Sequence, residues 1–261
     1  DRTRGSKLRV HFVDAISQQG AKAHSAVLRY TKDPDWQVRV AAVRGLPKVK
    51  EETAVIGALR RLMRDDARIE VRAEALRAIS KIDRMEGAKS GRAVLKSHRD
   101  LSTLALQRAA LGAVRRGESV GDIGILLRVA RAPRHHWVRT DALRRAAQLA
   151  IEVEEKRARR TKEESVADVA SSLLRSERIQ IVQAAIGVLS TLRVAETQGP
   201  LEQLASESTD PDIARLAREA AQTVMTRRAE KKPKERADEV KALEARIKEL
   251  EGRMTGVEWR R

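Results

Sequence analysis

The chain has 261 residues, a formal net charge of +17 and no cysteine, and only 2% of its residues are aromatic. The absence of cysteine excludes structural disulfides and zinc sites built on thiolates, and no run approaches the ~18 to 20 continuous apolar residues of a membrane span. With so few aromatics, the core must be built from small aliphatic side chains at close helix contacts. The start at Asp1, not at Met, indicates a fragment or processed form, so the compartment is left open.

One helical phrase recurs along the chain at a period of roughly three dozen residues. It reads VRVAAVRGL from Val38, VRAEALRAI from Val71, LQRAALGAV from Leu106, VRTDALRRA from Val138 and, more loosely, IVQAAIGVL from Ile181. Self-similarity at about 30 to 45 residues, with two helices per period, is typical of α-solenoids. The sequence therefore predicts an all-α superhelix whose core is continuous along its length.

Each repeat is expected to hold a helix A, a short turn and a helix B that carries the phrase. Residues 1–19 precede the repeats as an N-terminal extension, and residues 20–228 hold five to six of them. Two turns, Asp33–Asp35 and Asp210–Asp212, read DPD, in which proline fixes φ and the aspartates can cap the next helix. The predicted repeats span residues 20–49, 51–82, 86–116, 118–154, 162–192 and 197–228.

Charged segments interrupt and follow the repeats. Residues 152–164 predict either the charged end of a helix or a loop, and residues 229–237, which contain Pro233, predict a linker. Residues 238–258 then carry a heptad stripe that predicts an amphipathic coil helix. Because the stripe spans fewer than three heptads, this helix needs a partner, another copy or the solenoid's own surface. Its apolar positions are Val240, Leu243, Ile247, Leu250, Met254 and Val257.

The segment DPDWQVRVAAVRGL, residues 33–46, resembles the HEAT-repeat consensus, in which a turn Asp precedes a Val-Arg pair and an Ala-Leu core. In that family the Asp and Arg form a hydrogen-bonded ladder between neighbouring repeats, which the resemblance implies for Arg39, Arg72 and Arg139. Gln107 and Val182 replace the Arg in the third and fifth repeats. The matching residues are Asp33, Asp35, Val38, Arg39, Ala42 and Leu46, then Asp66, Val71, Arg72, Ala75 and Leu76, then Val138, Arg139, Ala142 and Leu143.

The order of parts is similar to the C-terminal portion of bacterial zinc aminopeptidases of the aminopeptidase N type. It consists of HEAT repeats, a last helix reading DPDIARLAREAAQTV, a charged linker and a short coil, and it covers nearly the whole chain. The H-E-x-x-H motif of those enzymes is absent, because no histidine here is followed by Glu. The resemblance therefore implies the non-catalytic end of such an enzyme, with the catalytic domain as its partner.

Two positions of the phrase, six and ten residues after its first, lie opposite the apolar face of helix B and are mostly basic. Stacked repeats should align them as a ridge, which Gly112 and Gln148 interrupt. The ridge is either a solvated face or a surface for an anionic partner, and the net charge favours the second reading. We define the basic ridge as Arg44, Lys48, Arg77, Lys81, Arg116 and Arg144.

The group HHWVRTD, His135–Asp141, brings imidazole, aromatic and carboxylate side chains together. A Trp and an Asp four residues apart resemble the site of HEAT-like alkylpurine DNA glycosylases. Trp36 lies close to the corresponding place in the first repeat, however, which favours a packing role for Trp137 and a surface role for Asp141. No phosphate loop, nucleophile elbow or paired carboxylates are present. We expect a non-catalytic scaffold without cofactor or metal, bound to a protein partner or parent catalytic domain. The alternatives are binding to a nucleic-acid backbone and, after it, a glycosylase.

Overall fold

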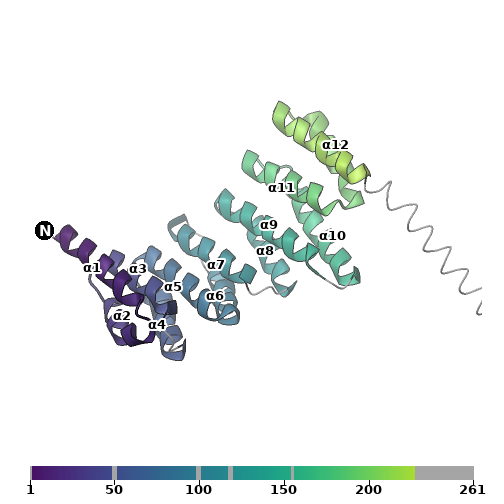
Figure 1. The fold of residues 1–261 in the computed structure, drawn as a ribbon. Helices are drawn as coiled ribbons and strands as arrows, with labels where there is room; N and C mark the ends of the chain where they lie inside the picture. Colours follow the sequence, from purple (N-terminus) through teal and green to yellow (C-terminus); the bar gives the residue numbers. More distant parts are fainter. Residues whose placement is uncertain (1, 49–51, 98–100, 117–119, 154–155, 227–261) are drawn as a thin grey trace, which may run out of the picture.

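The computed structural model describes residues 2–48, 52–97, 101–116, 120–153 and 156–226. Within these ranges every regular element is a helix and no strand occurs, so the predicted all-α class is confirmed. The helices stack along one direction into an elongated body (Figure 1). None of the described helices is both long and apolar enough to cross a membrane. The predicted linker and coil helix, residues 229–237 and 238–258, lie outside the described residues.

The predicted alternation of A and B helices is present along the described chain, with a first helix α1 (Arg2–Ser17) before it. The A helices are α2 (His24–Tyr30), α4 (Glu52–Asp65), α6 (Arg84–Ser97), α8 (Ile123–Arg131), α10 (Lys156–Leu173) and α12 (Gln198–Glu207). The B helices are α3 (Trp36–Gly45), α5 (Ile69–Ile82), α7 (Leu104–Arg116), α9 (His136–Ile151), α11 (Ile179–Leu192) and the helix at residues 211–226. Short 3-10 helices are η1 (Gly20–Ala23), η2 (Leu46–Lys48), η3 (Leu101–Thr103), η4 (Val120–Asp122) and η5 (Ala195–Thr197).

Helix α1, which the sequence analysis leaves outside the repeats, packs against α3 as one B helix packs against the next. It also carries the phrase, since LRVHFVDAI from Leu8 aligns with VRVAAVRGL from Val38. Val38 is fully buried, whereas Leu8 is 68% exposed, because no described helix covers that side of α1. The stacking of B helices therefore begins within the predicted extension.

The core is aliphatic and rich in alanine, as the composition predicts. Buried side chains form one cluster that runs from α1 to α5 and another that runs from α5 to residues 211–226. Helix α5 belongs to both clusters: Val71 and Ile79 pack toward the first and Leu76 toward the second. The core therefore continues along the stack, with each helix burying its apolar side chains against its neighbours.

The helix ends follow local chemistry. Asp35 caps α3, since its side chain accepts a hydrogen bond of 2.8 Å from the main-chain N–H of Gln37. Helix α3 ends at Gly45, earlier than the phrase predicts, because Pro47 cannot donate its nitrogen to a continuing helix. Within the charged run, residues 156–164 form the first turns of α10 instead of extending α9 or forming a loop, and Arg159 pairs there with Glu163 at 2.8 Å.

Candidate interaction surface

The predicted basic ridge lies on the exposed side of the B helices, which we call the ridge face. Arg44 on α3, Arg77 and Lys81 on α5, and Arg144 on α9 are all exposed. The side chains of the other two members are not described by the structure: these are Lys48 in η2 and Arg116 at the end of α7. The ridge is thus four described cations distributed over three helices.

Two ridge cations from neighbouring repeats meet at one carboxylate. Arg44 Nε lies 3.3 Å from Glu74 Oε1, and Arg77 Nη1 lies 2.8 Å from Glu74 Oε2. Glu74 is only 8% exposed, so its charge is held between the two guanidinium groups. The contact therefore brings Arg44 and Arg77, which hold the same position in successive repeats, to one carboxylate. It also neutralises part of the charge that the sequence assigns to this surface.

Arg144, unlike Arg44 and Arg77, does not share a carboxylate with another described ridge cation. Asp141 lies one helical turn before Arg144 in the sequence, but it pairs with Arg145 instead, at 3.0 Å. Within the described residues Arg144 forms no ion pair, and its guanidinium is exposed. It is therefore available to an external anionic group.

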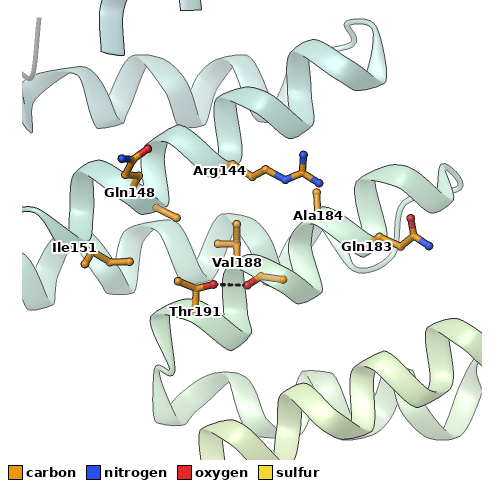
Figure 2. Close-up of a pocket in the computed structure, with 9 residues that line it drawn as sticks. Arg144, Gln148, Ile151, Gln183, Ala184, Val188 and Thr191 are labelled. Carbon is orange, nitrogen blue, oxygen red and sulfur yellow. Dashed lines mark hydrogen bonds between the residues drawn. The ribbon is translucent and has the colours of Figure 1, made fainter. Parts of the chain in front are cut away.

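Arg144 stands at the edge of a groove of about 400 Å³ between α9 and α11. Figure 2 shows Arg144, Gln148 and Ile151 on one helix and Gln183, Val188 and Thr191 on the next. The floor is apolar, with Ala147 and Ala184 completing it, and amide and hydroxyl groups stand around it. This arrangement suits a ligand that combines an aliphatic part with a negative charge.

The groove exists because the ridge positions of α11 are small. Six residues after Ile181 comes Gly187, and ten residues after it comes Thr191. A Cβ added at Gly187 would meet nothing within 4 Å, so no side chain fills the space beside Val188. Gly187 was visible in the sequence as the member of the phrase that aligns with Arg44 and Arg77. Sequence reasoning missed the groove because only the basic members of the series were followed.

The ladder implied by the HEAT resemblance is present at Arg39. Its Nε and Nη2 lie 2.8 and 2.9 Å from the carboxylate oxygens of Asp66 in the next repeat. Arg72 and Arg139 donate to main-chain carbonyls of their own repeats, at Met63 and Ala130. Arg139 has no carboxylate partner among the described residues, and burial lowers its pKa.

Three further connections between repeats were not predicted. Arg9 on α1 binds Asp33 with its Nε 2.9 Å from Oδ2, and Arg92 on α6 binds Asp122 with its Nη2 3.0 Å from Oδ2. Gln107 stands where the phrase lacks its Arg, and here the donor and acceptor exchange places. Arg134 in the following turn donates to Gln107 Oε1 on the B helix, at 2.9 Å. Polar side chains therefore link repeats even where the consensus pair is missing.

Comparisons with known proteins agree with this architecture. The family described as HEAT repeats matches residues 6–80 and 25–115, which includes most of α1. Residues 6–115 therefore resemble HEAT repeats, and the described chain as a whole is an all-α solenoid. A search of curated proteins finds no match. One solved structure, described as "Computational Design of Self-Assembling Cyclic Protein Homooligomers", covers 84% of this chain and 83% of its own, at 16% identity and a TM-score of 0.18. The low TM-score gives that likeness no weight, and the aminopeptidase resemblance gains no support.

The structure places the His135–Asp141 group at the start of α9, beyond the residues that the family model matches. Trp137 is 53% exposed, more than a packing role predicts, and the guanidinium of Arg108 lies 5.3 Å from the centre of its ring. Partial burial, then the charges of His135 and Arg178, lower the pKa of His136. Among the described residues, no three His, Asp or Glu side chains gather as metal ligands would. Asp141 Oδ1 lies 3.0 Å from Arg145 Nε, so this carboxylate takes part in an ion pair within α9.

Proposed function

We propose that this chain is a non-catalytic scaffold that binds an acidic protein partner along its ridge face. The observation that carries the proposal is Arg144, an exposed cation without an ion pair within the described residues, at the edge of an apolar groove. Protein interfaces combine an apolar centre with charged groups around it. HEAT repeats commonly supply such extended surfaces, because the stacked helices present one face over a long distance.

A protein partner fits this face better than the backbone of a nucleic acid. Nucleic-acid affinity depends on many cations placed along the phosphates, yet Arg44 and Arg77 already share Glu74. The floor of the groove, with Ala147, Ala184 and Val188, offers contacts to aliphatic groups that phosphates do not possess. The net charge of +17 is the observation that favours nucleic acid, and it makes backbone binding the second candidate.

We also infer that the scaffold serves a larger protein, such as an aminopeptidase-like zinc metallopeptidase. The support is the order of parts in the sequence, in which HEAT repeats precede a charged linker and a coil. A reading frame upstream of Asp1 that encodes an H-E-x-x-H helix would support this attachment. A frame that encodes no such helix would contradict it, while the scaffold proposal would remain.

The scaffold proposal is tested with two charge-reversal variants of the full chain. The first changes Lys81 and Arg144 on the ridge face to Glu, and the control changes Lys89 and Arg131, which are exposed on A helices, to Glu. None of the four forms an ion pair with a described residue, so neither variant breaks an internal contact. Both variants alter the net charge equally.

The probes are amphipathic helical peptides with the same apolar residues and either Glu or Lys on the polar face. Fluorescence anisotropy should show that the acidic peptides bind more tightly to the parent chain. The ridge variant should lose this preference several-fold, because the cation beside the groove is reversed, while the control should keep it. Equal binding by the two variants, or no preference for acidic peptides, would contradict the proposal.

A further inference from the structure

We infer that the groove between α9 and α11 is the docking site of the chain's own C-terminal segment, residues 238–258. The segment binds there as a helix, with its apolar stripe on Ala147, Ala184 and Val188 and its acidic edge beside Arg144. This internal contact does not depend on the proposed partner. It means that any partner of the ridge face competes with a segment already attached to the protein.

The groove has the lining expected of a helix-binding site. Its walls are two B helices that run side by side, and its floor is made of small aliphatic side chains. The gap at Gly187 gives room for a bulky side chain from a third helix, since a Cβ there would contact nothing within 4 Å. Amphipathic helices bind in such apolar grooves through residues spaced three and four apart.

The two edges of the groove differ in charge. The α9 edge carries Arg144 and Gln148, whereas the α11 edge carries Gln183 and Thr191, which are neutral. Arg144 is the charged residue among those that line the groove, since the amide of Gln148 is neutral and donates to Glu152 Oε1 at 3.0 Å. A docked helix should therefore bind most tightly when one of its edges is acidic and that edge faces α9.

Residues 238–258 have this asymmetry. In the heptad of the apolar stripe, every e position is acidic: Glu244, Glu251 and Glu258. The g positions on the other edge are mixed, with Glu239, Arg246 and Arg253. In a parallel dimer Arg246 would meet Glu251, but Glu239 would oppose Glu244, so the charges do not specify self-association. By contrast, the groove specifies one orientation of the docked helix, in which the acidic e positions lie beside Arg144.

The segment can reach the groove. The chain between the helix at residues 211–226 and position 238 extends to roughly 36–40 Å, at about 3.3–3.6 Å per residue. Packed helices lie about 8–10 Å apart, so a groove beside the neighbouring B helix, α11, is within about 20 Å. The tether gives the segment an effective concentration of about millimolar. This compensates for the marginal stability of a helix with fewer than three heptads.

The absence of cysteine permits a direct test by disulfide cross-linking in the full chain. The test variant carries Gly187→Cys in the groove together with Ile247→Cys in the stripe. The control carries Gly124→Cys on α8 with the same Ile247→Cys. Both glycines are exposed helical positions with open space for a Cβ, so the two variants are matched. A disulfide forms only when the Cβ atoms approach to about 3.5–4.5 Å.

We expect the intramolecular disulfide to form at least about tenfold faster in the Gly187 variant than in the Gly124 variant, because docking raises the local concentration of the thiol. Adding Arg144→Glu should slow it several-fold by repelling the acidic edge. Equal rates in the two variants would overturn the inference. So would predominantly intermolecular disulfides at micromolar protein, which would identify a second copy as the occupant.

A cysteine-free measurement keeps the test independent of the Ile247 substitution. The changes Leu243→Asp and Leu250→Asp, made together in the full chain, place charges on the stripe and should release the segment. Amide hydrogen exchange should then become several-fold faster in α9 and α11 while α3 and α5 stay unchanged. Unchanged exchange in α9 and α11 would overturn the inference.

Discussion

Arg39 and Asp66 form a two-pronged ion pair across the boundary between the first two repeats, with Nε 2.8 Å from Oδ2 and Nη2 2.9 Å from Oδ1. The two side chains are 14% and 5% exposed. Arg39 Nη1 also donates to the main-chain oxygen of Asp33 at 2.9 Å, so one guanidinium connects two turns. The hydrogen bond to Asp66 is the largest cause that raises the pKa of Arg39.

The ion pair predicts different effects for two adjacent aspartates. Asp66→Asn should lower the free energy of unfolding by about 2–4 kcal/mol, because Arg39 loses a largely buried counterion. Asp65→Asn should change it by less than about 1 kcal/mol, since Asp65 pairs with the exposed Arg64. Urea denaturation followed by circular dichroism measures both values. Equal losses would show that the buried pair adds nothing specific.

Glycines in helices should respond to alanine with opposite signs. A Cβ at Gly87 would lie 2.6 Å from Ser80 Cα, so Gly87→Ala forces α5 and α6 apart and should cost about 1–3 kcal/mol. Gly57 in α4 has nothing within 4 Å, and Gly57→Ala should stabilise the chain by about 0.5–1 kcal/mol. Thermal melts of the two variants decide the signs. A loss at both positions would mean that the packing at Gly87 is not special.

Nucleic-acid binding, the second candidate function, has its own signature. If the ridge holds phosphates, DNA should bind with a dissociation constant on the order of 10⁻⁴ to 10⁻⁶ M at physiological salt and weaken steeply as salt rises. Lys81→Glu with Arg144→Glu should abolish this binding, and Lys89→Glu with Arg131→Glu should reduce it less. Arg44 and Arg77 are left in place because their removal would strand the buried Glu74. Equal losses in both variants would show that the ridge is only a solvated face.

His136 should titrate below the ordinary histidine range. Its pKa is lowered by partial burial and by the nearby charges of His135 and Arg178. Arg178→Gln should raise this pKa, since a like charge is removed, and proton NMR of the imidazole measures it. Because the unfolded chain binds the proton more readily, stability should fall as pH drops below about 6.5. His136→Gln should remove that component; an unchanged pH profile would contradict the assignment.

The shape of the stack predicts the scattering of the protein in solution. A compact globule of this length has a radius of gyration of roughly 18 Å. The helices in Figure 1 follow one another along a line, and each packs mainly on its neighbours. Small-angle scattering should therefore give a radius well above that value. A radius near 18 Å would require the solenoid to fold back on itself in solution.

Much of the fold could be predicted from the sequence because the signals are local. The spacing of Val38, Ala42, Val43 and Leu46 places one face of α3 in the core, and the same spacing repeats at Val71. The DPD turn supplies its own cap at Asp35. The same local pattern was present at Leu8, but α1 was not recognised as part of the stack. Its phrase has His11 and Phe12 where the phrase from Val38 has Ala41 and Ala42, and its outer side remains exposed.

The sequence by itself determined that the chain is helical, repetitive and built on aliphatic side chains, because these properties depend on spacing within one helix. Only the tertiary structure decided which charges remain available. Arg44 on α3 pairs with Glu74 on α5, the next B helix. Arg144 has no described counterion, because Asp141 pairs with Arg145 instead. The groove at Gly187 likewise depends on how closely α9 and α11 approach. Such contacts join residues far apart in the chain, and no local pattern encodes the distance between them.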